Sequence, residues 1–105
     1  MKNLFFDVST KDSIEIFSKL YNKNSNYLCV FFHWNKDNIL TDKKYVDQFE
    51  NKFNIYVNWI DITSLYTEYD KINQKLKIND DDILNTIKNY FILQLCLTYE
   101  CKSHL

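Results

Sequence analysis

The side chains of this chain that could act as nucleophiles or metal ligands are three cysteines and two histidines. Near the end of the sequence, Cys96, Cys101 and His104 form a C-x4-C-x2-H cluster. Zinc takes four ligands, and His33 is the one histidine left over, so we expect no metal site. The two thiols of the cluster could instead react with each other. An intramolecular Cys96–Cys101 disulfide would require a turn in the tail and oxidising conditions.

Cys29 differs from these thiols because it lies inside an apolar stretch that runs from Tyr27 to Trp34. Free cysteine is among the most frequently buried residue types, and a buried thiol without a cationic neighbour is unreactive. We therefore expect Cys29 to be a core residue with no chemical role.

His33 stands at the end of the same apolar stretch. Ligands of open α/β sheets bind at the carboxyl ends of the strands, so the position would suit a catalytic histidine. Such a histidine needs a nucleophile or an acid within reach. Asp37 or Asp61 could orient the ring, but no nucleophile is evident. We expect a histidine that is solvated or packed at the sheet edge, and neither catalysis nor a cofactor.

The elements that would position these residues alternate between strand and helix. Strands are predicted at about 4–8, 27–34 and 55–62, and the continuous apolar run at 28–32 indicates a central strand covered on both faces. The order β-α-β-α-β-α implies parallel strands with right-handed crossovers. Helical spacing marks the apolar faces of three helices: Ile14, Phe17, Leu20 and Tyr21; Tyr45, Val46, Phe49 and Phe53; and Leu65, Tyr69, Ile72 and Leu76.

The last third of the chain is ambiguous. Ile83, Leu84 and Ile87 have helical spacing, and we expect a helix from about Asp81 through Tyr90. A strand over 90–98 competes with it, and the structure of 91–105 stays open. We treat 1–105 as a single domain with 90–105 as a tail of undetermined structure. Another alternative is that the chain is a shortened product of a longer protein.

Composition narrows the possible classes of protein. With 105 residues, 46% of them hydrophobic, the chain fits one folded domain and is not disordered. All 13 basic residues are lysine and the net charge is −1, so binding to nucleic acid is not expected. No apolar stretch approaches the ~20 residues of a membrane span. The odd number of cysteines and the lack of a signal sequence indicate the cytoplasm.

Gly, Pro, Ala and Arg are all absent, whereas Asn, Lys, Ile and Tyr are abundant. This bias is typical of coding in an AT-rich genome, so single Asn or Lys residues carry little functional meaning. Every turn has to form without glycine. We therefore expect Asn and Asp at the left-handed backbone positions.

The segment after the central strand resembles the active-site region of the thioredoxin family. The strand ends in Trp34, a polar segment at 35–38 and a helix follow, and the next strand ends in Asp61. In the family, the strand ends in Trp-Cys-Gly-Pro-Cys, but here Asn35 and Asn38 replace both cysteines. Asparagine supplies no thiolate, and the family's cis-proline has no counterpart.

This resemblance covers roughly residues 3–65. It implies an α/β, thioredoxin-like sandwich with a mostly parallel central sheet and helices on both faces. The family continues with an antiparallel hairpin and a final helix, so the C-terminal part of this chain would be shortened or degenerate.

Two functions of different classes follow from the resemblance. The first is a redox-inactive thioredoxin-like domain that acts as an adaptor by binding another protein. Its contact surface would consist of His33, Trp34, Asn35, Lys36, Asp37 and Asn38. The alternative is an atypical thiol-redox protein of cell redox homeostasis that uses Cys96 or Cys101, and this requires an accessible thiol with a low pKa.

Overall fold

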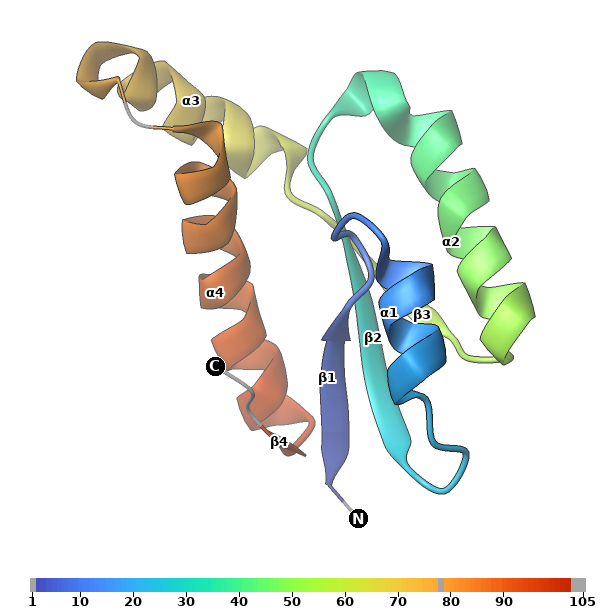
Figure 1. Ribbon diagram of the computed structural model, residues 1–105. Helices are drawn as coiled ribbons and strands as arrows, with labels where there is room; N and C mark the ends of the chain where they lie inside the picture. The colour runs from blue at the N-terminus through green and yellow to red at the C-terminus, as the bar shows by residue number, and fades with distance from the viewer. Residues whose placement is uncertain (1, 78, 103–105) are drawn as a thin grey trace.

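The computed structural model describes residues 2–77 and 79–102 of the chain (Figure 1). Strands and helices alternate through the first 61 residues, and two helices and a very short strand follow. In chain order the elements are β1 (Asn3–Asp7), α1 (Ser13–Leu20), β2 (Asn26–His33), the 3-10 helix η1 (Lys36–Asn38), α2 (Ile39–Phe53), β3 (Val57–Asp61), α3 (Thr63–Leu76), α4 (Asp80–Thr98) and β4 (Cys101–Lys102).

The sheet has the strand order β3-β2-β1-β4, and all its pairs are parallel. In the described part of the chain, β4 contributes two residues, which pair with Asn3 and Leu4 at the start of β1. The described residues contain no antiparallel pair and no cis peptide bond. The predicted parallel α/β arrangement is therefore confirmed. Its strand order is the one found in open doubly wound sheets.

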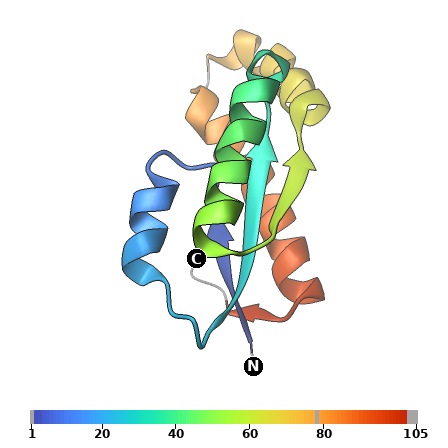
Figure 2. The same cartoon turned by 90° about the vertical axis from the view of Figure 1, so that its right-hand side faces the viewer.

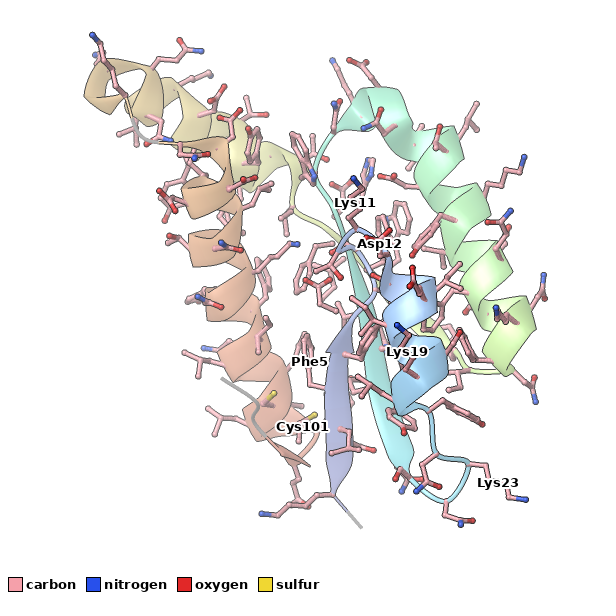
Figure 3. All side chains as sticks on the ribbon, in the orientation of Figure 1. Phe5, Lys11, Asp12, Lys19, Lys23 and Cys101 are labelled. Carbon is pink, nitrogen blue, oxygen red and sulfur yellow. The ribbon has the colours of Figure 1, made fainter. Side chains whose placement is uncertain are left out.

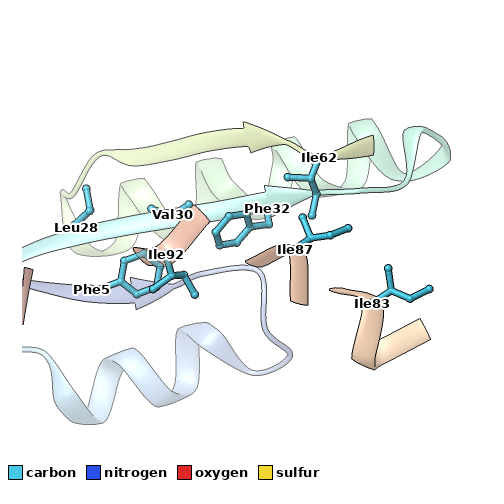
Figure 4. Packing of buried hydrophobic residues seen from close by; sticks show 8 residues of the cluster. All are labelled: Phe5, Leu28, Val30, Phe32, Ile62, Ile83, Ile87 and Ile92. Carbon is cyan, nitrogen blue, oxygen red and sulfur yellow. The ribbon is translucent and has the colours of Figure 1, made fainter. Parts of the chain in front are cut away.

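Two layers of helices enclose the sheet (Figures 1 and 2). α1 and α2 cover one face, where Phe17 and Phe49 pack against Cys29 and Phe31 of β2. α4 covers the opposite face, where its isoleucines pack against the alternate residues of the strands (Figure 4). That second cluster consists of Phe5, Leu28, Val30, Phe32, Ile62, Ile83, Ile87 and Ile92. The expected central strand with both faces buried is thus confirmed.

α4 is longer than predicted and removes the ambiguity of the last third. It spans 19 residues and ends at Thr98, so the competing strand over 90–98 is wrong. Its buried positions Ile83, Ile87 and Ile92 keep helical spacing across the whole segment, and this keeps one apolar face on the sheet. The predicted tail is therefore helix and a short strand as far as residue 102. Residues 103–105 lie outside the described part.

The predicted apolar face of α3 is not buried. Leu65, Tyr69 and Ile72 are 37%, 43% and 58% exposed, and the side chain of Leu76 lies outside the described part. Figure 1 shows the cause, because α3 extends away from the sheet and packs mainly against α4. No strand of the described sheet lies beneath the outer half of α3. Its apolar residues therefore have helical spacing but no core to pack against.

Within residues 2–77 and 79–102, left-handed backbone conformations occur at four non-glycine residues. Asp12 and Asn54 have φ of 65° and 52°, and Asn54 ends α2 as predicted. The other two are Lys77 and Glu100, so the expectation that Asn and Asp would occupy all such positions is wrong. A side chain other than Asn or Asp gains no local hydrogen bond there, and the surrounding packing has to hold it.

No helix within residues 2–77 and 79–102 is both long and apolar enough to cross a membrane. α4 has sufficient length, but asparagine, lysine and three aspartates interrupt its apolar positions.

Substitution of two leucines, one buried on β2 and one exposed on α2, tests how much the packing of β2 contributes to stability. Leu28 is 7% exposed in the cluster under α4, whereas Leu40 is 82% exposed on α2. We expect Leu28→Ala to lower the free energy of unfolding by about 3 kcal/mol, because it leaves a cavity in the core. Leu40→Ala, the same chemical change, should alter it by less than about 0.5 kcal/mol. Urea unfolding measures both, and equal effects would contradict this packing.

Candidate functional site

The candidate site lies where β2 and β3 end side by side. Register pairing places His33 opposite Asp61, and the Ile62 backbone N–H donates to the His33 carbonyl over 2.8 Å. From this point the chain leaves β2 into η1 and leaves β3 into α3. Both departures occur at the carboxyl edge of the sheet, the edge at which open α/β sheets bind ligands.

A groove of ≈ 500 Å³ opens between these two departures. We call it the edge groove. One wall comes from the segment after β2, and the other comes from the first turns of α3. Its lining residues are Trp34, Asn35, Lys36, Asp37, Thr63, Ser64, Tyr66, Thr67 and Glu68.

Two aromatic residues form the apolar part of the edge groove. Trp34 and Tyr66 are each half-buried, and their ring centroids lie 4.7 Å apart at an interplanar angle of 50°. Both also pack against the core cluster beneath α4, which fixes their positions. The rim of the groove carries charges of both signs, which come from Lys36, Asp37 and Glu68. An apolar centre with a polar rim is the usual anatomy of a recognition surface.

The segment between β2 and α2 is held by its own hydrogen bonds. The Asn35 side chain accepts from the Asp37 backbone N–H over 3.0 Å, and the Asn38 N–H donates to the Asn35 carbonyl over 2.9 Å. Asn35 is therefore the N-cap of η1, which leads directly into α2 at Ile39. Asn38, the residue before α2, makes no capping hydrogen bond with its side chain. The hydrogen bonds at Asn35 fix the backbone between β2 and α2, so the other side chains of this segment project from defined positions.

Of the two environments expected for His33, solvated or packed at the sheet edge, the structure has the packed one, with only 2% of the residue exposed. Its Nδ1 donates to the Asp42 carboxylate over 2.8 Å, and its ring stacks on Trp59 with centroids 5.0 Å apart. The predicted orienting partners, Asp37 and Asp61, are thus wrong. Strand alternation turns His33 toward α2, whereas the next residue, Trp34, faces the edge groove. His33 is a structural residue in this arrangement.

Asp61 connects the end of β3 to α3. Its carboxylate accepts from the Thr63 backbone N–H over 2.9 Å. The proximity of the Thr63 hydroxyl and then the hydrogen bond from the Thr63 backbone lower the pKa of Asp61, and the nearby His33 contributes in the same direction. Asp61 is exposed. It therefore stabilises the start of α3 as a carboxylate.

The cysteines are divided between the two layers. Cys29 is fully buried, and burial raises its pKa to about 12, in agreement with the predicted core role. Cys96 and Cys101 are half-buried on the other face. Burial, followed by the adjacent Cys96, raises the pKa of Cys101 to about 11. An activated cysteine nucleophile needs a lowered pKa, so the raised pKa of Cys101 is unfavourable for that role.

Of the six predicted contact residues, four line the edge groove. These are Trp34, Asn35, Lys36 and Asp37; His33 is buried beneath α2, and Asn38 is exposed outside the groove lining. Residues 2–77 and 79–102 contain no group of three or more His, Cys, Asp or Glu side chains that could hold a metal. His104, the third member of the C-terminal cluster, lies outside the described residues.

Two residues of this region were missed at the level of sequence. Tyr66 was overlooked because the apolar face of α3 was assigned to Leu65, Tyr69 and Ile72, although Tyr66 is the one that contacts the core. Asp42 could have been found, because strand alternation directs His33 to the α2 face and Asp42 lies in the first turn of that helix.

Comparison of the chain with protein-family models, with curated proteins and with solved structures finds no match. Functional inference therefore depends on the geometry of the edge groove.

Removal of Asp42 should destabilise the domain, because the His33 Nδ1–H loses its acceptor inside the core. We expect Asp42→Ala to lower the free energy of unfolding by roughly 1–3 kcal/mol. Asp47→Ala, on an exposed position of the same helix, should change it by less than about 0.5 kcal/mol. Chemical unfolding at neutral pH gives both values. Similar losses for the two variants would mean that the His33–Asp42 pair is unimportant.

Asp61 should make stability depend on acidity. Its pKa is lower in the folded state, so its contribution is complete above the unfolded aspartate pKa of about 3.9 and is lost as the pH falls through the folded value. We therefore expect Asp61→Asn to be less stable than the parent at neutral pH. The difference should shrink toward about pH 3. A difference that stays constant with pH in urea titrations would disagree with this role.

Proposed function

We propose that this chain is a protein-interaction module that binds a short segment of another protein in the edge groove. The observation that carries the proposal is the Trp34–Tyr66 pair in a groove at the carboxyl edge of the sheet. Aromatic side chains that are held in place by a core behind them are the usual energetic centres of protein interfaces, because they bury large areas at little cost in side-chain entropy.

The chemistry of the lining supports recognition. It combines two aromatic rings with hydroxyl, amide and charged groups, and it includes neither cysteine nor histidine. Such a set favours a partner segment with an apolar anchor residue flanked by polar groups. A partner of this kind would place its apolar side chain on Trp34 and its polar groups toward Lys36 and Glu68.

Membership of the thioredoxin-like family stays a prediction. It is supported by Trp34 at the exit of β2, by Asp61 at the end of the neighbouring β3 and by the helix that follows each strand. The family's antiparallel hairpin has no counterpart in the part of the chain that the structure describes. The proposed binding role is argued from the groove and does not need the family assignment.

We place the protein in the cytoplasm as part of the same proposal. Support comes from its three cysteines, all of which are free thiols. The alternative function, an atypical thiol-redox protein, has less support because the raised pKa of Cys101 disfavours the thiolate.

Selection of random peptides against the folded protein tests the proposal without knowledge of the partner. Selected peptides should bind Trp34→Ala and Tyr66→Ala about thirty-fold more weakly than the parent, which corresponds to ~2 kcal/mol. Tyr56→Ala is the matched control, because Tyr56 is 74% exposed just before the amino end of β3. Its affinity should equal that of the parent in fluorescence titrations.

Thermal melts of the three variants separate lost binding from lost folding. Selected peptides that bind all variants equally would place the binding surface elsewhere. A selection that yields no peptide would contradict the module as proposed.

A further inference from the structure

The end of α4 brings two cysteines together through a tight reversal of the chain. The Tyr99 backbone N–H donates to the Leu95 carbonyl over 2.9 Å and closes the last turn of the helix. Glu100 then takes a left-handed conformation with φ of 52°. The reversal directs Cys101 into β4, where it pairs with Asn3. A Cys96–Cys101 bridge depends on such a turn, and the structure contains one.

The two thiols lie on the same side of the sheet, because both side chains pack against the core cluster beneath α4. Cys96 is close enough to Cys101 to contribute to its raised pKa. Figure 3 labels Cys101 beside the end of that helix. Cys29 belongs to the cluster on the opposite face of the sheet, so it cannot compete for either partner.

We propose that Cys96 and Cys101 are a redox-modification site that closes to an intramolecular disulfide when the protein meets hydrogen peroxide. The site lies near the start of β1, at the amino end of the sheet, whereas the edge groove lies at the carboxyl ends of β2 and β3. This inference is therefore independent of the proposed binding function.

The reaction consumes one peroxide and two thiols. In the first step, the sulfur of Cys96 attacks one peroxide oxygen, the O–O bond breaks, and a sulfenic acid and water form. In the second step, the sulfur of Cys101 attacks the Cys96 sulfur, the S–S bond forms, and the S–O bond breaks. The thiol proton of Cys101 leaves with the hydroxyl group as a second water. Two electrons pass from the thiols to the peroxide.

The order of the two steps is part of the proposal. Burial and the adjacent Cys96 raise the pKa of Cys101 to about 11, which disfavours Cys101 as the thiol that attacks peroxide. We therefore assign the first attack to Cys96 and the second to Cys101.

The disulfide would connect the last turns of α4 to β4. In the reduced protein, two residue pairs join β4 to β1 within the residues that the structure describes, and the Asn3 side chain supports β4 by donating to the Tyr99 carbonyl over 2.9 Å. A covalent link across this turn holds Cys101 beside α4. Reduction by a small thiol would reverse the link.

Digestion with trypsin isolates the site in one peptide. Cleavage after Lys88 and Lys102 releases residues 89–102, which contain both cysteines, and cleavage after Lys23 and Lys36 releases 24–36 with Cys29. After treatment of the folded protein with peroxide and then iodoacetamide, the 89–102 peptide should be about 2 Da lighter than its dithiol form and carry no alkyl group. Peptide 24–36 should stay unoxidised, because Cys29 is fully buried.

The variants Cys96→Ser and Cys101→Ser provide the controls. Peptide 89–102 from Cys101→Ser should trap the sulfenic acid at Cys96, and the peptide from Cys96→Ser should stay a thiol at the same peroxide dose. Stepwise over-oxidation of separate thiols in the parent, or only intermolecular links, would overturn the proposal.

A second measurement separates a site built by the fold from chance pairing of close cysteines. In a glutathione redox buffer, the ratio of oxidised to reduced 89–102 peptide should be about tenfold higher for the folded chain than for the chain in urea, because the fold holds the thiols together. An equal or lower ratio in the folded chain would show that the native turn does not favour the disulfide.

Discussion

The double burial of β2 is the constraint on which the rest of this structure depends. Because successive side chains of a strand point to opposite faces, Cys29 and Phe31 require cover from α1 and α2, and Val30 and Phe32 require cover from α4. The same alternation continues through the end of the strand. It buries the His33 ring beneath α2 and leaves the following tryptophan for the edge groove. One backbone rule thus separates a structural residue from a candidate binding residue.

The missing glycine places a second constraint on the chain. Four turns use left-handed residues with side chains, and two of them, Lys77 and Glu100, lack the short polar group that eases this conformation. Such residues cost of order 1 kcal/mol or more each and persist only where neighbouring structure holds them. Two of the four positions return the chain to the sheet, because Asn54 ends α2 in front of β3 and Glu100 reverses the chain into β4.

The sequence was sufficient to predict the elements that bury their own apolar residues. The three main strands and the helices α1 and α2 follow from local patterns that tertiary packing reinforces. The exposure of the α3 face was not predictable in the same way. It depends on which elements lie opposite in space, and helical spacing on α3 is the same whether or not a sheet lies beneath it. For the edge groove, the wall that follows β2 was predicted from the resemblance around Trp34. The part that Tyr66 plays in the other wall could be recognised only from the folded structure.

The length of α4 has a consequence for how this domain tolerates insertions and deletions. Nineteen helical residues span about 28 Å, close to the roughly 26 Å of the eight-residue β2 that the helix runs back along. The length of α4 therefore determines that the chain returns to the start of β1. Loss of a single residue from its middle would shift everything after it by about 1.5 Å and rotate it by about 100°. β4 would then lose its place on the sheet edge, whereas a change of length in the outer half of α3, which covers no strand, would leave the sheet and both of its cores in place.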